Sequence, residues 1–478
     1  MLETLQHLWH TLLALPHARA WLTAAWVLYF LGLGSWILLQ KREPVATLSW
    51  LISLAALPYL GFFIYYIFGP QRLTRQRLRR RRTRLALPPS EHDASTQELR
   101  TLAQSTTGYA PTTACDVRLL VDGCSKYPAL LEAIASARHH VHLEYYILEP
   151  DHTGRSIRDA LIERASAGIA VRLLIDAVGS KRARRTFFKP LIDAGGEVAW
   201  FHPPKLWLPW RRPLVNLRTH RKIAVIDGRV GFIGGINLTD EEDPRRRTDA
   251  YRDLHLRIEG DAVRKLQDLF IDDWAYATGG RNFINEIACV MPRSCPGGVH
   301  VQLLTSGPDS PWEAIHRLHV SAIHDAKRRV WLATPYFVPG EAALMALTSA
   351  ALGGLDVRLL VPKRSDSLLV TLCVRSFYDD LISAGVKVYE YGPRMLHTKA
   401  LLVDDQLAIV GSANFDYRSF RLNFEASLLL NSARVAEQLS DLLTGEFQHA
   451  QQVSAQRPKP LLAVRLPEAF ARLFAPLL

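Results

Sequence analysis

The sequence contains few of the residues that hold metal ions or cross-link a small domain. Only five of the 478 residues are cysteines, and no two of them form a CxxC pair. These are Cys115, Cys124, Cys289, Cys295 and Cys373. An odd number without paired spacing predicts neither a disulfide framework nor a zinc site, and it is typical of reduced thiols in a reducing compartment. HExxH and Cys/His ligand clusters are also absent, so no metal is predicted.

A nucleotide-binding signature is missing as well. The chain has no GxxxxGK[ST] loop, so we expect neither nucleotide-driven chemistry nor a cofactor. Acidic residues are the minority: 58 Lys and Arg against 46 Asp and Glu give a formal charge of +12. This balance favours an anionic partner, either nucleic acid or a membrane rich in acidic lipid, and composition does not choose between them.

Two long uncharged segments lie near the N-terminus, at 21–40 and 45–69. Each is long enough to cross a hydrocarbon core of about 30 Å, and the four residues 41–44 between them predict a transmembrane helical hairpin. The alternative, a cleaved signal peptide, is disfavoured because two spans follow one another without a small-residue cleavage site. Eight arginines at 71–84 place the chain beyond residue 70 in the cytoplasm by the positive-inside rule. Residues 1–15 are predicted to form an interfacial amphipathic helix.

After a predicted linker at 85–114, strands and helices alternate. Strands are predicted at 117–121, 141–148, 170–176 and 197–201, and helices at 128–138, 155–167 and 184–194. The same order returns with strands at 300–304, 330–338, 356–361 and 387–391, and helices at 312–326, 341–353 and 367–384. Alternation with apolar strands predicts an α/β layered fold. The near copies AVRLLID and DVRLLVP indicate an internal duplication, with two pseudo-symmetric halves packed side by side.

Each half ends in the same motif, HxKxxxxDxxxxxxG[GS]xN. The first copy comprises His220, Lys222, Asp227, Gly234, Gly235 and Asn237, and the second comprises His397, Lys399, Asp404, Gly411, Ser412 and Asn414. In an extended segment, residues two apart face the same side, so each copy presents an imidazole and an ammonium together. The aspartate would end the strand, the small residues would let the backbone approach a ligand, and the asparagine amide could donate to an oxyanion.

The two motifs resemble those of the phospholipase D superfamily, over about residues 115–455. The segments at 251–263, 268–279, 334–339, 396–404 and 422–428, with the double N-terminal span, resemble bacterial cardiolipin synthases. Tyr251 departs from the tryptophan expected in many relatives, and we expect it to touch no catalytic atom. The resemblance implies two α/β/α sandwich halves behind a membrane hairpin, in the bacterial cytoplasmic membrane with the catalytic domain facing the cytoplasm.

The resemblance also implies a mechanism. One histidine attacks the lipid phosphorus to give a phosphatidyl-histidine, and the other protonates the leaving alkoxide. The substrate would be phosphatidylglycerol, which both donates and accepts the phosphatidyl group, giving cardiolipin and glycerol. By family analogy His220 is the nucleophile and His397 the acid, although the symmetry of the motifs leaves this open.

The other candidate residues have supporting roles. Lys222 and Lys399 would neutralise the phosphate, and Asn237 and Asn414 would donate to its oxygens. Asp253 and Glu425 would orient His220 and His397 respectively. Asp227 and Asp404 complete the candidate catalytic set, and we expect them to fix turns rather than touch substrate.

Three alternatives remain. The first is a membrane-tethered phosphodiesterase or nuclease of the same fold, although the hairpin favours lipid over nucleic acid. The second is a scaffold without activity, and intact motifs in both halves argue against it. A CDP-dependent route is disfavoured because no DGxxAR-type pattern is present. The predicted domains are an anchor (1–70), a polybasic segment and linker (71–114), two halves (115–290 and 291–455) and an amphipathic tail (456–478).

Overall fold

The structure is a computed structural model of the whole chain. It describes residues 18–39, 47–48, 51–52, 54–55, 94–203, 216–279, 283, 298–310 and 312–477. Two compact units are present: Met1–Arg72 with Lys205–Asn216, and Leu73–Pro204 with Leu217–Leu478.

The smaller unit contains helix α2 (Ala18–Leu39), which covers nearly all of the first predicted span. Ile37 of this helix packs against Leu54, a residue of the second predicted span, and Leu28 and Trp36 are exposed. None of the helices in the described part of the chain has both the length and the apolar composition needed to cross a membrane. Most of the second predicted span, the arginine run and residues 1–15 lie outside the described residues.

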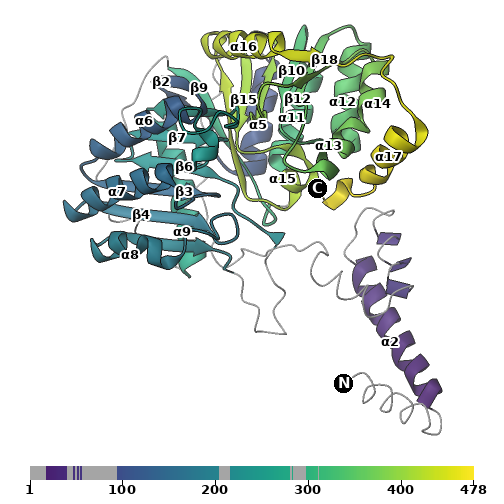
Figure 1. Cartoon of the computed structure of the whole chain (residues 1–478), viewed down its shortest axis with the longest axis horizontal. Coiled ribbons are helices and arrows are strands. Elements are labelled where there is room, and N and C mark those ends of the chain that lie inside the picture. Colours follow the sequence, from purple (N-terminus) through teal and green to yellow (C-terminus); the bar gives the residue numbers. More distant parts are fainter. Residues whose placement is uncertain are drawn as a thin grey trace. The chain divides into compact units, whose positions relative to one another are not determined.

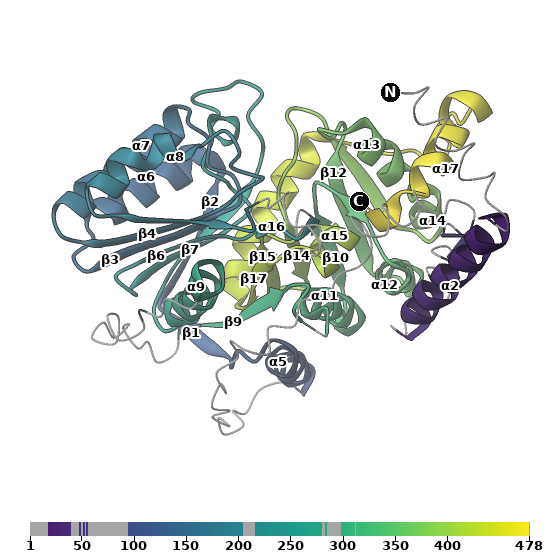
Figure 2. The ribbon, with the colours of Figure 1, turned by 90° about the horizontal axis from the view of Figure 1, so that it is seen from below.

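The first half of the larger unit is a seven-stranded sheet in the order β2-β8-β7-β6-β3-β4-β5. Its strands are β2 (Asp116–Val121), β3 (His140–Tyr145), β4 (Ala170–Asp176), β5 (Glu197–Phe201), β6 (Lys222–Ile226), β7 (Val230–Gly234) and β8 (Leu254–Glu259). Its helices are α6 (Asp122–Ala135), α7 (His152–Ser166), α8 (Arg185–Asp193) and α9 (Ala262–Thr278), with the short η2 (Asp240–Glu242). Figure 2 shows α6, α7 and α8 on one face of the sheet and α9 on the other.

The second half repeats this order in a nine-stranded sheet, β1-β9-β17-β15-β14-β10-β12-β13-β18. Its strands are β1 (Thr112–Ala114), β9 (Val299–Ser306), β10 (Arg329–Ala333), β12 (Asp356–Pro362), β13 (Lys387–Tyr391), β14 (Ala400–Val403), β15 (Leu407–Gly411), β17 (Glu425–Asn431) and β18 (Ala450–Gln452). β11 (Phe337–Val338) and β16 (Phe415–Asp416) form a separate pair. Between the edge strands β1 and β18, the seven inner strands follow one another as in the first sheet, as the internal duplication predicts. Figure 1 shows the two halves of the larger unit side by side.

Helices of the second half complete the α/β layers. They are α5 (Ala94–Thr107), α11 (Ala314–Asp325), α12 (Glu341–Leu352), α13 (Leu368–Arg375), α14 (Tyr378–Ser383), α15 (Tyr417–Arg421), α16 (Ala433–Gln448) and α17 (Leu466–Arg472), with the short η3 (Leu461–Arg465) and η4 (Ala475–Leu477). In the predicted C-terminal tail, Ala471 of α17 is buried, whereas Leu466 and Phe470 of α17 and the following Leu473 are exposed.

An apolar core joins the two halves. It combines Val225 of β6 and Leu266 of α9 with Leu428 of β17 and Leu439 of α16, all of which are fully or almost fully buried. Burial of apolar surface between two sheets is the main force that holds such halves together. The halves are therefore one packed body, which fixes how their motifs face each other.

Some local predictions were wrong. The predicted linker at 85–114 contains α5 and β1, and β1 pairs with β9 of the second half, because its edge N–H and C=O groups find partners there. The strand predicted at 330–338 breaks between β10 and β11 at Pro335, which has no N–H to donate. The helix predicted at 367–384 divides at Ser376, whose hydroxyl donates to the carbonyl of Cys373 at 2.6 Å.

The interpretation of the cysteines also needs a correction. Cys115 is disulfide-bonded, whereas Cys124 and Cys373 are free, as expected. Sequence spacing could not reveal this bond, because a disulfide depends on the approach of two distant segments.

Candidate active site

The two motifs occupy equivalent hairpins at the edge where the halves meet. Lys222 is the first residue of β6 and Lys399 directly precedes β14, while His220 and His397 lie two residues upstream of each lysine. All four side chains are buried. The strands β6 and β14 begin at or just after the lysines, so both histidines precede the strand on which they were expected to lie.

Short bridges connect each histidine segment to the other half. Thr219 pairs with Phe424 and Arg252 pairs with Leu396, both in parallel orientation. The backbone N–H of His220 donates to the carbonyl of Phe424 at 2.9 Å, and that of His397 donates to the carbonyl of Arg252 at 2.7 Å. The residue after each bridged carbonyl, Glu425 or Asp253, therefore lies beside a histidine of the opposite half.

In this arrangement, each motif histidine is paired with the carboxylate that was predicted for the other histidine. His220 Nδ1 lies 2.9 Å from Glu425 Oε1, and His397 Nδ1 lies 2.6 Å from Asp253 Oδ2. The sequence-based pairing of Asp253 with His220 and of Glu425 with His397 was wrong. It assumed that each half completes its own site, but the segments that carry Asp253 and Glu425 each pair with the histidine segment of the other half.

Burial sets the electrostatics of the histidine–carboxylate pairs. The pKa of His220 falls to about 4, first because of burial and then because Lys222 and Lys399 repel its charged form. Burial alone would raise the pKa of Glu425, but His220, Lys222 and the Ser412 hydroxyl outweigh it and hold the pKa below its usual value. Lys399 thus acts on His220 across the interface, so the two motifs form one electrostatic unit.

Both lysines fold back over their own histidine segments. Lys222 Nζ donates to the carbonyl of His220 at 2.7 Å, and Lys399 Nζ lies 3.2 Å from Asp253 Oδ2. Lys399 Nζ also donates to the carbonyl of His397. Burial lowers the pKa of Lys222 to about 7 and that of Lys399 below its ordinary value, and Lys399 further lowers the pKa of Lys222.

The two asparagines differ in their contacts. Asn237 Nδ2 donates to Glu242 Oε1 at 3.0 Å, and its Oδ1 accepts from the backbone N–H of Ile147 at 3.3 Å. Asn414 is buried, and its Oδ1 has no hydrogen-bond partner among the described residues. The amide of Asn237 has two N–H groups, and the bond to Glu242 uses one of them.

The motif aspartates do not join the site. Asp227 accepts from three backbone N–H groups, those of Arg138, His139 and His140, at 2.8–2.9 Å. Asp404 accepts in the same way from the N–H groups of residues 327–329. Both have positive φ, 53° and 52°, at the turn that follows the motif strand. They lie at the far end of β6 and β14 from the histidines, which agrees with the expected turn-fixing role and removes them from the catalytic set.

The small residues of the motifs make room for the carboxylates. A Cβ on Gly235 would lie 2.3 and 2.4 Å from the oxygens of Asp253, so only glycine fits there. The equivalent residue of the second half is Ser412, whose hydroxyl donates to Glu425 Oε2 at 2.5 Å. The G[GS] position therefore serves the carboxylate that holds the opposite histidine.

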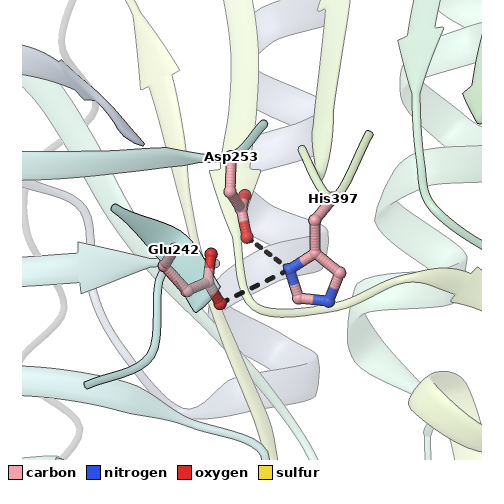
Figure 3. A group of neighbouring side chains, drawn as sticks. All are labelled: Glu242, Asp253 and His397. Atoms are coloured by element: carbon pink, nitrogen blue, oxygen red, sulfur yellow. Dashed lines mark hydrogen bonds and ion pairs between the residues drawn. The ribbon is translucent and has the colours of Figure 1, made fainter. Parts of the chain in front are cut away.

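Sequence reasoning missed three residues of this site. Glu242 is buried, and its Oε1 lies 3.9 Å from His397 Nδ1 (Figure 3). The ring centroid of Tyr251 lies 5.4 Å from that of His397, contrary to the expectation that Tyr251 is remote, and the ring of Tyr146 meets the His220 ring edge-on at 4.9 Å. Glu242 lies five residues after Asn237, where the second repeat has Ser419. Comparison of the two repeats at that position is the signal that could have found it.

One cluster offers ligand atoms of the kind that metals bind. Atoms of Glu242, Asp253 and His397 lie within 4.8 Å of one another. The ammonium of Lys399 contacts two of them, lying 2.8 Å from His397 Nδ1 and 3.2 Å from Asp253 Oδ2. The Lys399 ammonium thus already occupies the space beside two of the donors and would repel a metal cation, so the residues present do not suit a metal ion.

Comparisons with known proteins agree with this architecture. The family model described as "Cardiolipin synthase, PLD-like domain" matches residues 130–274 and 319–447, and "Phospholipase_D-nuclease N-terminal" matches residues 20–70. The structure of phosphatidylserine synthase from Haemophilus influenzae Rd KW20 superposes with a TM-score of 0.60 at 14% identity, covering 80% of this chain and 98% of that one. The duplicated fold and its paired motifs are those of the phospholipase D superfamily.

Full-length relatives narrow the assignment. A cardiolipin synthase of Geobacillus sp. (strain WCH70) is 39% identical, covering 92% of this chain and 91% of the relative. Cardiolipin synthase 1 of Bacillus anthracis is 35% identical, with 95% and 93% covered. The chain therefore belongs to the cardiolipin synthase family.

Proposed function

We propose that this protein is a phosphatidyltransferase that makes cardiolipin from two molecules of phosphatidylglycerol. The observation that carries the proposal is the exchange of partners at the interface, where each motif histidine is held by a carboxylate of the opposite half. This exchange supports a single composite site, in which two imidazoles act on one phosphodiester. Membership of the cardiolipin synthase family supplies the substrate class.

In the first half-reaction, a ring nitrogen of His220 attacks phosphorus. Its Nδ1 is engaged by Glu425, so Nε2 is the nitrogen left for the attack. The P–N bond forms and the P–O bond to glycerol breaks. The departing oxygen keeps the bonding electron pair and takes a proton from His397, and glycerol leaves.

In the second half-reaction, the glycerol hydroxyl of another phosphatidylglycerol gives its proton to His397. Its oxygen attacks phosphorus and the P–N bond breaks, which restores His220 and releases cardiolipin. One phosphodiester is exchanged for another, so the reaction needs no nucleotide.

The lysines and asparagines complete the phosphate-binding site in this proposal. Lys222 and Lys399 neutralise the phosphate, and Asn237 and Asn414 donate to its non-bridging oxygens. Donors fixed in a water-excluded site stabilise a transition state by about 2.7–4 kcal/mol each.

The protein would work at the bacterial cytoplasmic membrane, on anionic lipid. The match of residues 20–70 to a phospholipase D N-terminal family, the exposed apolar side chains of α2 and the packing of Ile37 on Leu54 support a helical hairpin anchor. The arginine run favours a catalytic domain on the cytoplasmic side. The disulfide at Cys115 favours an oxidising compartment instead. Protease protection in right-side-out vesicles decides the orientation: a protected catalytic domain supports the cytoplasmic side, and a digested one refutes it.

The activity is tested with the purified full-length protein. Vesicles of phosphatidylglycerol alone should yield cardiolipin and free glycerol in equal amounts, detected by mass spectrometry. Phosphatidic acid with no cardiolipin, or cleavage of DNA with no lipid product, would replace the proposal by a phosphodiesterase or a nuclease. With His220→Ala no phospho-enzyme should form, whereas an adduct persisting on His397 would reverse the two roles.

A further inference from the structure

The two histidines differ in the number of carboxylates that face them. His397 Nδ1 lies 2.6 Å from Asp253 and 3.9 Å from Glu242, and Figure 3 shows both carboxylates directed at this one nitrogen. His220 Nδ1 is paired with the single carboxylate of Glu425. The other side-chain donors to Glu425 are neutral, the hydroxyl of Ser412 and the amide of Asn423.

The fold does not need a carboxylate at position 242. Glu242 Oε1 accepts from the backbone N–H of Asn237 at 3.3 Å. In the second repeat the residue at the same offset is Ser419, whose hydroxyl oxygen accepts from the backbone N–H of Asn414 at 3.2 Å. A neutral hydroxyl therefore caps the equivalent turn, so the backbone contact does not require a charge at position 242. Glu242 Oε1 also accepts from Asn237 Nδ2 at 3.0 Å, and a neutral carbonyl oxygen could accept that bond as well.

The surroundings of Glu242 indicate which group its negative charge stabilises. Its side chain is buried, and Oε2 has no hydrogen-bond partner among the described residues. A buried carboxylate in this situation is costly unless a positive charge lies close by. Burial raises the pKa of Glu242, and the charge of Asp253 adds to that rise. The charged forms of His397 and Lys399 oppose it, His397 more than Lys399, so Glu242 and an imidazolium at His397 stabilise each other.

The charged groups around the two imidazole rings favour opposite protonation states. Asp253 and Glu242 bring two negative charges to His397, against one positive charge on Lys399, so an imidazolium makes the group neutral. Lys126 is buried near the same two carboxylates, and burial lowers its pKa well below the ordinary value, which disfavours its charged form. Tyr251 also faces this ring, and burial raises its pKa to about 12, so it is uncharged at neutral pH. Around His220, one negative charge on Glu425 faces Lys222, and Lys399 also repels the charged form of the ring, so a neutral imidazole fits.

We infer that Glu242 is a positioning residue for His397, whose carboxylate keeps that imidazole in the protonated form needed to donate to the leaving oxygen. This inference rests on the proposed function. After the proton has passed to glycerol, the group of Asp253, Glu242 and Lys399 is left with one net negative charge. That charge favours the return of a proton from the incoming hydroxyl, so the same residue supports both half-reactions.

The test compares two leaving groups in Glu242→Gln. Glycerol leaves as an alkoxide and needs a proton, whereas p-nitrophenolate leaves without one. With phosphatidylglycerol, the variant should release glycerol about 10- to 100-fold more slowly than the wild type. With phosphatidyl-p-nitrophenol, its release of p-nitrophenolate should stay within about threefold of the wild type. Equal slowing with both substrates would mean a structural role and would overturn the inference.

The pH profile of kcat provides a second readout. Removal of one carboxylate that favours the imidazolium should move the alkaline limb of kcat to lower pH by about one unit. Glu242→Asp keeps the charge and should keep the alkaline limb in place. An unshifted limb in Glu242→Gln would contradict the inference.

Two further variants protect the result. Glu242→Ser copies the second repeat and should preserve the turn. It should show the same loss that we expect of Glu242→Gln, and it keeps the inference testable if the glutamine variant fails to fold. Glu241→Gln removes the neighbouring charge, which pairs with Arg247 at the surface, and should match the wild type. If wild-type protein releases p-nitrophenolate but makes no cardiolipin from phosphatidylglycerol, the proposed function fails while the leaving-group comparison on Glu242 still stands.

Discussion

His220 of the first half and Glu425 of the second half form a buried pair across the interface, with 2.9 Å between Nδ1 and Oε1. Its counterpart, His397 with Asp253, runs in the opposite direction. Each pair therefore takes one member from each half, and the interface between the halves positions both motif histidines.

Neutralising either interface carboxylate should impair phosphatidyl transfer without unfolding the protein. We expect Glu425→Gln and Asp253→Asn each to lower the rate by about 10²- to 10⁴-fold, because the amide no longer fixes the tautomer and orientation of its histidine. Glu425→Gln should also lower the yield of phospho-enzyme, measured by rapid quench with radiolabelled lipid. Asp193→Asn, which alters an exposed pair with Lys189, is the control. Rates within threefold of wild type in both variants would refute the pairing.

The pH dependence of kcat/KM should report the titration of His220 and Lys222 in the free enzyme. The His220 pKa of about 4 means that its imidazole stays neutral above that pH, so activity should fall only as the pH drops through about 4. The Lys222 pKa of about 7 means that its positive charge is lost as the pH rises through about 7, which should weaken capture of the anionic lipid.

Lys222→Arg separates these effects, because arginine stays charged throughout the accessible range. The variant should lose the fall near pH 7 in kcat/KM even if its overall rate is lower. A wild-type profile that is flat from pH 6 to 9, or an arginine variant that keeps the fall, would exclude Lys222 as its source.

The motif aspartates should matter for stability rather than chemistry. Asp227→Ala removes the acceptor of three backbone N–H groups, and we expect it to reduce the free energy of unfolding by about 2–4 kcal/mol. Thermal unfolding in detergent, followed by tryptophan fluorescence, measures this loss. Phospho-enzyme formation per folded molecule should stay near the wild-type value, and a selective loss of chemistry in fully folded protein would return Asp227 to the catalytic set.

The sequence predicted those features that repeat or that depend on local spacing. The motif residues His220 and His397, the strands around 170–176 and 356–361, and the turns at Asp227 and Asp404 all follow from local pattern. The partners of the histidines could not be predicted in this way, because the choice between Asp253 and Glu425 depends on how two sheets pack. The disulfide bond of Cys115 could not be predicted for the same reason. Glu242 was missed because the motif ends at Asn237, five residues earlier.

Gly235 provides the sharpest structural test of the interface. A Cβ at this position would lie 2.3 and 2.4 Å from the carboxylate oxygens of Asp253, so Gly235→Ala must push that carboxylate away from His397. A displacement of about 1 Å in a catalytic group can cost about 100-fold in rate, and we expect a loss of at least that size in cardiolipin synthesis. Gly445→Ala is the matched control, because no atom lies within 4 Å of its added Cβ in α16. It should retain full activity and gain about 0.5–1 kcal/mol in stability. If Gly235→Ala synthesises cardiolipin as fast as Gly445→Ala, then Asp253 does not hold His397 during catalysis.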